Sequence, residues 1–280
     1  MSVRIITDSA CDMSCADHPA LTVLPLSVAF GERVYQDGVD LSHERFYEML
    51  VEEDELPTTG QITPYAYARA IKDAEEAGEE VLIIALSDKL SGTYHSAVTA
   101  AAEAASRPRV VDTQSVTVGE RVLVEYALRL ADQGLGAGQI ADAVEAARDR
   151  VVVVGLLDTL EYLRRGGRVP AAVGVVGELL SIKPVVTVED GEVVLLGRAR
   201  GSKNGRNLLT REIERAGGVD FSMPLVLGYS GLSDALLQKY VKDSRALWEG
   251  HAGELPVHTV GATIGTHVGP GAIAVAFFRP

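Results

Sequence analysis

The residues best suited to bind an anion follow apolar segments in the first half of the chain. In the stretch LSDKLSGTYHSA, the apolar segment Val81–Leu86 is followed by Ser91, Gly92 and Thr93, and then by small residues typical of a helix. Hydroxyl groups and the free backbone N–H groups of a helix N-terminus hold anions well. The sequence therefore predicts an anion-binding turn at these three residues.

Three further polar clusters follow apolar segments or precede a helix in the same way: Asp8-Ser9, Thr58–Gln61 and Asp112–Ser115. In an open parallel sheet the carboxyl ends of the strands meet along one edge, where ligands bind. Ser and Thr also cap helices for purely structural reasons, so each cluster alone is weak evidence. The joint pattern indicates a ligand site at that edge.

The second half of the chain supplies cations and one histidine. His267 lies in IGTHVGPGA, where the glycines bring the backbone close and leave room for a ligand, although a lone histidine is often structural. The basic residues gather around Gly166-Gly167 and in a later stretch, which is either a solvated surface or the surroundings of an anionic group. They are Arg164, Arg165, Arg168, Lys183, Arg198, Arg200, Lys203 and Arg206.

Several kinds of active site are missing from the sequence. It has no Gly-x-x-x-x-Gly-Lys-Ser/Thr phosphate loop, no Gly-x-Ser-x-Gly elbow and no clustered His/Cys set for a metal. Asp8, Asp12 and Asp112 could chelate magnesium, but aspartates at strand ends more often cap turns. A hydrolase built on Ser91, His267 and an aspartate has no support in the spacing. We therefore expect no catalytic residue, no metal and no cofactor.

Strands alternate with helices in the first half, which predicts a parallel sheet flanked by helices. The expected strands are Val3–Thr7, Leu21–Phe30, Val81–Leu86 and Arg109–Asp112, with a small hairpin closed at Gly31-Glu32. The expected helices are His43–Val51 with Ser42 as cap, a helix to Gly78 with Thr63 as cap and Pro64 at its first position, Tyr94–Ala105, Val118–Gln133 and Gln139–Arg150.

The second half has the pattern of an α+β domain with antiparallel pairing. Its strongest signal is a hairpin at Asp190-Gly191 between two apolar segments. The other expected elements are helices at Asp158–Arg165, Ser202–Ala216 and Asp234–Trp248, and strands at Leu225–Tyr229, Val257–Val260 and Ala272–Phe278. The sequence predicts two domains, residues 1–154 and 155–280, with the ligand at their interface.

Composition limits the class of partner. The 280 residues are 47% hydrophobic, enough for a sizeable core, and the net charge of −13 disfavours generic nucleic-acid binding. No apolar run is long enough for a transmembrane segment and the N-terminus lacks a signal-peptide layout, so a cytoplasmic protein is expected. Cys11 and Cys15 are expected to be reduced thiols, because a metal site would need more ligands.

Eight motifs together resemble one known family. ITDSACD, PTTGQIT, LSGTYHSA, DTQSVTVGE, LEYLRRGGRV, LLSIKPVV, GRARGSKN and HVGPGAIAVAFF follow one another in the order found in the DegV family, from Ile5 to Phe278. The resemblance implies a two-domain α/β protein that binds one long-chain fatty acid. It also implies a role as the acyl-binding subunit of a bacterial fatty acid kinase. A separate kinase would then phosphorylate the bound carboxylate with ATP, giving acyl phosphate for phospholipid synthesis.

The resemblance also implies roles for particular residues. The carboxylate-binding residues fall on Thr59, Ser91 and His267, with Gly92 and Thr93 at the adjoining helix start. Contact with the kinase or the acyl phosphate falls on Arg198, Arg200 and Arg168. One departure is that Gly60 stands where the family usually has serine, and Ile62 replaces a proline, so one hydroxyl of the motif is absent.

Elementary energetics agrees with a fatty acid ligand. Burying a methylene is worth about 0.8 kcal/mol, so a tail of roughly fifteen carbons offers on the order of 12 kcal/mol before ordering costs. Ala171–Leu180 and Ile273–Phe278 are candidate tunnel walls, although any core segment looks like this. Three alternatives stay open: a stand-alone hydrolase, a small-molecule kinase of related fold, and a lipid store or sensor without a kinase. Transient contact with a membrane is compatible with each.

Overall fold

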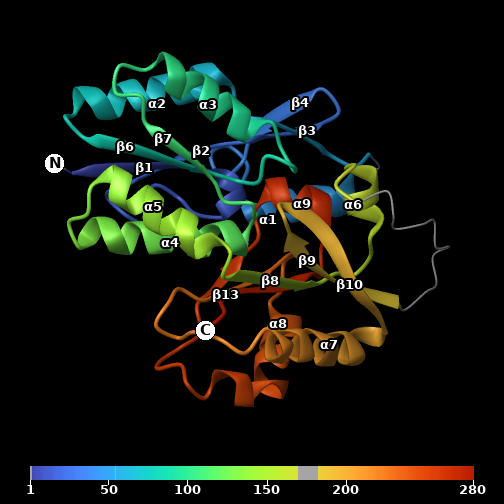
Figure 1. The fold of residues 1–280 in the computed structure, drawn as a ribbon. Helices are drawn as coiled ribbons and strands as arrows, with labels where there is room; N and C mark the ends of the chain where they lie inside the picture. Colours follow the sequence, from blue (N-terminus) through green and yellow to red (C-terminus); the bar gives the residue numbers. More distant parts are fainter. Residues whose placement is uncertain (1, 54, 170–181) are drawn as a thin grey trace.

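The chain forms two halves, each built on a large sheet, with the ends of the chain in different halves (Figure 1). The computed structural model describes residues 2–53, 55–169 and 182–280. The N-terminal half has a parallel sheet between helices, and the C-terminal half has a mostly antiparallel sheet with helices. The predicted α/β fold class is therefore confirmed.

A four-stranded parallel sheet forms the centre of the N-terminal half. Its strands, in spatial order, are β2 (Leu21–Leu24), β1 (Val3–Asp8), β6 (Glu80–Ala85) and β7 (Arg109–Asp112). Helices cover both faces of the sheet (Figure 1). On one face lie α2 (Pro64–Glu76) and α3 (Thr93–Glu103), and on the other α4 (Val118–Asp132) and α5 (Ala137–Arg148).

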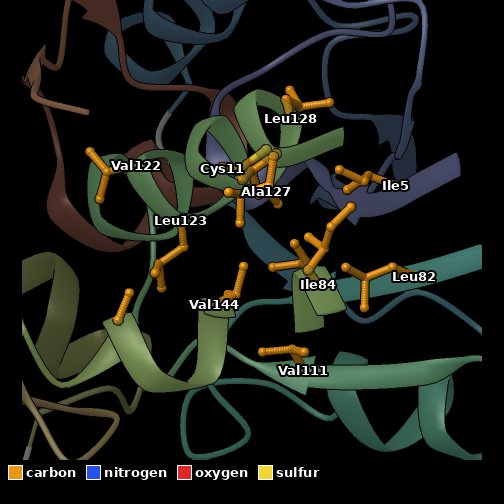
Figure 2. Close-up of a cluster of buried hydrophobic side chains, with 14 of the residues drawn as sticks. Ile5, Cys11, Leu82, Ile84, Val111, Val122, Leu123, Ala127, Leu128 and Val144 are labelled. Carbon is orange, nitrogen blue, oxygen red and sulfur yellow. The ribbon is translucent and has the colours of Figure 1, made fainter. Parts of the chain in front are cut away.

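Alternation of side chains along the strands explains these two layers. Ile5 on β1 and Leu82 and Ile84 on β6 are buried in the cluster that includes α4 and α5 (Figure 2). Ile6 and Ile83, the next residues along each strand, are buried against α2 and α3 instead. Successive strand side chains point to opposite faces, so continuously apolar strands of this kind need helices on both sides.

A small antiparallel sheet adjoins the parallel one. Its strands, in spatial order, are β4 (Arg33–Gln36), β3 (Ser27–Phe30) and β5 (Thr58–Gly60), and α1 (His43–Glu52) packs beside it. The predicted caps of two helices are confirmed: Ser42 Oγ accepts from Arg45 N at the start of α1, and Thr63 Oγ1 accepts from Ala66 N at the start of α2. Each cap satisfies one of the N–H groups that a helix start leaves free.

The C-terminal half is built on a six-stranded sheet. In spatial order its strands are β10 (Glu192–Arg200), β9 (Ile182–Glu189), β8 (Val151–Leu156), β13 (Ile273–Phe278), β11 (Val226–Tyr229) and β12 (Val257–Thr259). All neighbouring pairs are antiparallel except β11 with β12. The predicted hairpin is confirmed, because Asp190-Gly191 joins β9 to β10. The first strand of this sheet begins at Val151, slightly before residue 155.

Helices complete the C-terminal half. α7 (Gly201–Arg215) and α8 (Ala235–Asp243) pack on one face of its sheet, while α4 lies between the two sheets and contacts both. Two short helices, α6 (Glu161–Arg165) and α9 (Ala262–Val268), lie side by side near the junction of the halves. The 3₁₀ helices are η1 (Ser9–Cys11) and η2 (Arg245–Trp248). No helix within the described residues is long and apolar enough to cross a lipid bilayer.

Two sequence-based elements are wrong, and one helix was not predicted. The single strand predicted over Leu21–Phe30 is two strands in different sheets, because Pro25 interrupts the pairing. The helix predicted to continue to Trp248 ends at Asp243, and a 3₁₀ helix follows. Helix α9, which carries His267, was not predicted because its glycines and threonines are poor helix formers.

Candidate functional site

A cavity of about 240 Å³ lies between the four-stranded sheet of the N-terminal half and the six-stranded sheet of the C-terminal half. Its walls come from loops after β5 and β6, from the facing surfaces of β8, β9 and β13, and from one side of α9. Most of the wall is aliphatic. Representative side chains are Leu86, Leu90, Val153, Leu157, Val186 and Ile264. The predicted wall Ile273–Phe278 contributes Ile273 and Ala274, while Ala171–Leu180 lies outside the described residues.

Polar side chains from both halves gather at one end of the cavity, which we call the polar end. Thr59 Oγ1 on β5 and His267 Nε2 on α9 lie 2.9 Å apart and form a hydrogen bond. Gln61, two residues after Thr59, donates from Nε2 to Ser96 Oγ at 3.2 Å. Ser91 also lines this part of the cavity. The structure thus brings together Thr59, Ser91 and His267, which come from three separate segments of the chain.

The turn before α3 brings Ser91 and Gly92 to the polar end. Ser91 Oγ accepts from Thr93 N at 3.2 Å and lies 3.0 Å from Thr93 Oγ1. A Cβ at Gly92 would lie 2.0 Å from Gln61 Oε1, so a larger residue here would push the Gln61 side chain aside. Within the part of the chain that the structure describes, Thr93 does not line the cavity. Its buried hydroxyl accepts a hydrogen bond from Ile62 N at 3.3 Å.

Burial keeps the His267 imidazole neutral. Burial of the ring, and secondarily the nearby cation of Arg168, lower the pKa of His267 from 6.5 to about 4. The ring packs closely on Gly166, where a Cβ would lie 2.2 Å from His267 Nδ1. At neutral pH His267 is therefore a hydrogen-bonding group rather than a positive charge.

The cation of the polar end is Arg168. Its Nε donates to Leu90 O at 3.1 Å and its Nη1 to Gly166 O at 2.6 Å. Among the described residues that line the cavity, Arg168 is the only charged one. A guanidinium in this place can counter the charge of a bound anion, while Thr59, Ser91 and Gln61 supply neutral hydrogen-bonding groups.

The opposite end of the cavity, which we call the deep end, lies beside Thr117 and Val260, near the start of α9. Thr117 has φ +51°, which is strained for a β-branched residue, and its hydroxyl donates to Asp12 Oδ2 at 2.6 Å. Asp12 Oδ1 also accepts from Gly261 N at 2.7 Å, at the start of α9. The N-terminal half thereby fixes the deep end and the beginning of the helix that carries His267.

Asp37 strengthens this attachment of α9. Its Oδ1 accepts from Ala262 N at 3.1 Å and its Oδ2 from Thr263 N at 3.0 Å. These are N–H groups that the first turn of a helix leaves without intrahelical partners. Helix α9 belongs to the C-terminal half in sequence, but carboxylates of the N-terminal half hold it in place.

The aspartates that could have chelated magnesium have structural partners. Asp8 accepts from Ala10 N and Leu86 N, and Asp112 accepts from Gln114 N. Burial raises the pKa of Asp8 to about 7 and that of Asp12 to about 6. Within residues 2–53, 55–169 and 182–280, no group of three or more His, Cys, Asp or Glu side chains could hold a metal ion. The cysteines are free thiols, Cys11 buried and Cys15 exposed.

The other predicted basic residues lie away from the cavity wall. Arg198 and Arg200 are exposed on β10 and line a shallow surface hollow with Asn204, Asn207 and Arg211. Lys183 pairs with Asp158, and the buried Arg206 pairs with Asp243 at 2.9 Å. Arg164 and Arg165 both pair with Glu161. The structure therefore separates Arg198 and Arg200 from Arg168, which lies at the polar end.

One residue at the polar end was not singled out from the sequence. Gln61 lies two positions after Thr59, the spacing that places side chains on the same side of an extended segment. The predicted cluster Thr58–Gln61 contained it, but at the carboxyl edge of the parallel sheet. That placement is wrong, because Thr58–Gly60 forms the edge strand β5 of the small antiparallel sheet.

Comparisons with known proteins agree with this architecture. The family model described as "Uncharacterised protein, DegV family" matches residues 2–279. A DegV domain-containing protein of Deinococcus radiodurans is 35% identical over 283 residues, covering 99% of this chain and 98% of that protein.

Solved structures share the fold. "Fatty Acid Binding of a DegV family Protein from Thermus thermophilus" has a TM-score of 0.89 and 31% identity, covering 99% of this chain and all (100%) of that one. A Streptococcus pneumoniae fatty acid kinase (Fak) B3 protein loaded with linoleic acid has a TM-score of 0.87 and 22% identity, with 100% of both chains covered. At 22% identity, this similarity shows a shared fold only.

Proposed function

Because the chain belongs to the DegV family, we propose that it binds one long-chain fatty acid in this cavity and presents the carboxylate to a separate ATP-dependent fatty acid kinase. The observation that carries the proposal is the division of the cavity wall. Thr59, Gln61, Ser91, Arg168 and His267 gather at one end, and the rest of the wall is mostly aliphatic, with the threonines Thr117, Thr187 and Thr263 as its other polar side chains. A molecule with one anionic end and a long apolar tail matches that division.

The two parts of the ligand have separate energetic roles. Each buried methylene contributes about 0.8 kcal/mol, so the tail supplies most of the affinity. A carboxylate buried without partners costs several kcal/mol, and this cost orients the ligand with its charge at the polar end. There we assign carboxylate contacts to Thr59, Ser91, Gly92 and His267, with Arg168 as the countercharge. Thr93 supports Ser91 through its hydrogen bonds instead of lining the cavity.

The kinase partnership rests on family membership and on the names of relatives. One structure of the same fold is described as a fatty acid kinase (Fak) B3 protein loaded with linoleic acid. We propose that Arg198 and Arg200, which are exposed outside the cavity, contact the kinase during phosphorylation. The phosphoryl group then passes from ATP to the carboxylate at the partner's active site, and this chain supplies no catalytic group. Acyl phosphate for phospholipid synthesis, made in the cytoplasm, is the expected product.

Mass spectrometry of an organic extract of the purified protein tests the binding step. We expect one long-chain fatty acid per chain, and its absence together with no uptake of added fatty acid contradicts the proposal. A second assay mixes the loaded protein with ATP, magnesium and a fatty acid kinase, and acyl phosphate is expected only with the kinase. Turnover of ATP or of a chromogenic ester by the chain alone would favour the stand-alone enzymes instead. Binding without phosphorylation by any kinase would favour a lipid store.

A further inference from the structure

The floor of the cavity contains a row of residues that crosses four strands. Val186 on β9 lies opposite Gly155 on β8, Gly155 lies opposite Ala274 on β13, and Ala274 lies opposite Gly228 on β11. All four residues line the cavity. Residues directly opposite on neighbouring strands share one face of the sheet, so the row is a continuous strip of the cavity floor.

The row extends along the cavity from the polar end toward the deep end. Val186 packs in a cluster with Leu163 and Val268, next to His267. At the other end of the row, a Cβ at Gly228 would lie 3.4 Å from Val260, which lines the deep end. Three steps between neighbouring strands span about 14 Å. A tail that followed this row from the polar end would cross β9, β8 and β13 and end near β11.

Gly155 is the position in this row where a side chain would enter the cavity. A Cβ there would meet only Val186 Cγ2 at 3.4 Å and Ile273 O at 3.7 Å, both ordinary contacts. Its φ is not positive, so the backbone does not require glycine. At Gly228 a Cβ would lie 2.7 Å from Val118 Cγ1 and meet packed protein instead. Glycine within a strand is destabilising, and the backbone at residue 155 would accept another residue. What a larger residue would remove is the open space of the cavity above Gly155.

We propose that Gly155 is a specificity-determining residue that permits long acyl chains, because its missing side chain leaves the cavity open between Val186 and Ala274. This inference rests on the proposed fatty acid binding and adds that the length of the acyl chain is the property selected. A side chain at position 155 narrows the cavity part-way along the row. Methylenes that would lie beyond Gly155, over Ala274, then lose their place, while the carboxylate and the first part of the tail keep theirs.

The test measures binding of saturated fatty acids of increasing chain length to the wild type, Gly155→Ala and Gly155→Val. For Gly155→Val we expect unchanged affinity for the shortest acids and, for longer acids, a loss of about fourfold for each methylene that no longer fits. Gly155→Ala should show the same trend more weakly. Gly138→Ala and Gly138→Val, at an exposed site on α5, are matched controls that should keep the wild-type profile.

Thermal unfolding of the lipid-free variants separates selection from damage. Valine favours strands, so we expect Gly155→Val to unfold at or above the wild-type temperature; if that variant does not fold, Gly155→Ala carries the test. An unchanged length profile, or an equal loss for every length, overturns the role of Gly155 and leaves fatty acid binding intact. Failure of the wild type to bind any acid of the series overturns the proposed function and this inference with it.

Discussion

Replacing Arg168 with methionine should weaken binding of a fatty acid but not of the matching fatty alcohol. Arg168 is the only charged side chain among the described residues that line the cavity. Two of its donors are held by Leu90 O and Gly166 O, which directs the guanidinium toward the polar end. Methionine retains much of the apolar stem and removes the charge, so the change isolates the electrostatic part of binding.

The size of the effect follows from the strength of a charge-assisted hydrogen bond. Such bonds contribute about 1.5–3 kcal/mol, which corresponds to about a 10- to 150-fold change in affinity. Arg168 is partly exposed, so solvent screens its charge and the lower end, about tenfold, is the expected loss. The alcohol has the same tail and no charge, and its affinity should change by less than about threefold.

Calorimetric titration with the acid and the alcohol measures this difference, and NMR titration of His267 supplies a second readout. The pKa of His267, about 4, is lowered first by burial and second by Arg168. In Arg168→Met only the second cause disappears, so the pKa should rise but stay below 6.5. Arg165→Met is the matched control, because Arg165 is exposed and pairs with Glu161 on the same segment.

Two results would refute the reasoning. If acid and alcohol lose affinity equally, Arg168 acts only through its hydrogen bonds to Leu90 and Gly166, and the polar end has no countercharge of this kind. If neither ligand loses affinity and the pKa of His267 stays at about 4, the guanidinium does not influence the polar end at all. Arg165→Met should match the wild type in every case.

Three further predictions test other parts of the molecule. Ser91→Ala should lower acyl-phosphate formation with the kinase by about fivefold or more while lowering fatty acid binding less, and full activity would count against its assignment. Arg200→Ala should retain bound lipid in the extract but slow phosphorylation; lost lipid would place Arg200 in the binding site instead. Glu120→Gln should raise the unfolding temperature, relative to the wild type, by an amount that grows as pH rises above 4.5. Burial raises the folded pKa of Glu120 well above 4.5, so its contribution to stability falls as pH rises from 4.5 toward the folded pKa. An unfolding-temperature difference that does not vary with pH would contradict this.

Local signals in the sequence were sufficient for much of the fold. Ser42 and Thr63 cap helices because their hydroxyls satisfy nearby N–H groups, and Asp190-Gly191 turns a hairpin because its residues tolerate positive φ. These effects act over a few residues, so sequence reasoning can find them. The parallel sheet flanked by helices was predicted in the same way, from the alternation of apolar strands with helical segments along the first half of the chain.

Long-range pairing was not readable from the residues alone. Thr59 and His267 are 208 positions apart, and their hydrogen bond depends on β5 pairing with β3 and on carboxylates that hold α9. The resemblance to a family named both residues but did not supply this geometry. Arg168 is similar: its place at the polar end depends on the carbonyls of Leu90 and Gly166, which no local pattern brings together.

The polar end is built from both halves of the chain, so a molecule bound there also stabilises the contact between the two halves. Thr59, Ser91 and the attached helix α9 with His267 lie with the N-terminal half, and Arg168 belongs to the C-terminal half, so any occupant that contacts both sets adds to the free energy holding the halves together. Binding equilibria are reciprocal: if the occupant weakens the binding of a partner that prefers separated halves, the partner weakens the binding of the occupant by the same factor. A partner that binds the separated halves more tightly would therefore favour release of the occupant, without any covalent change in this chain.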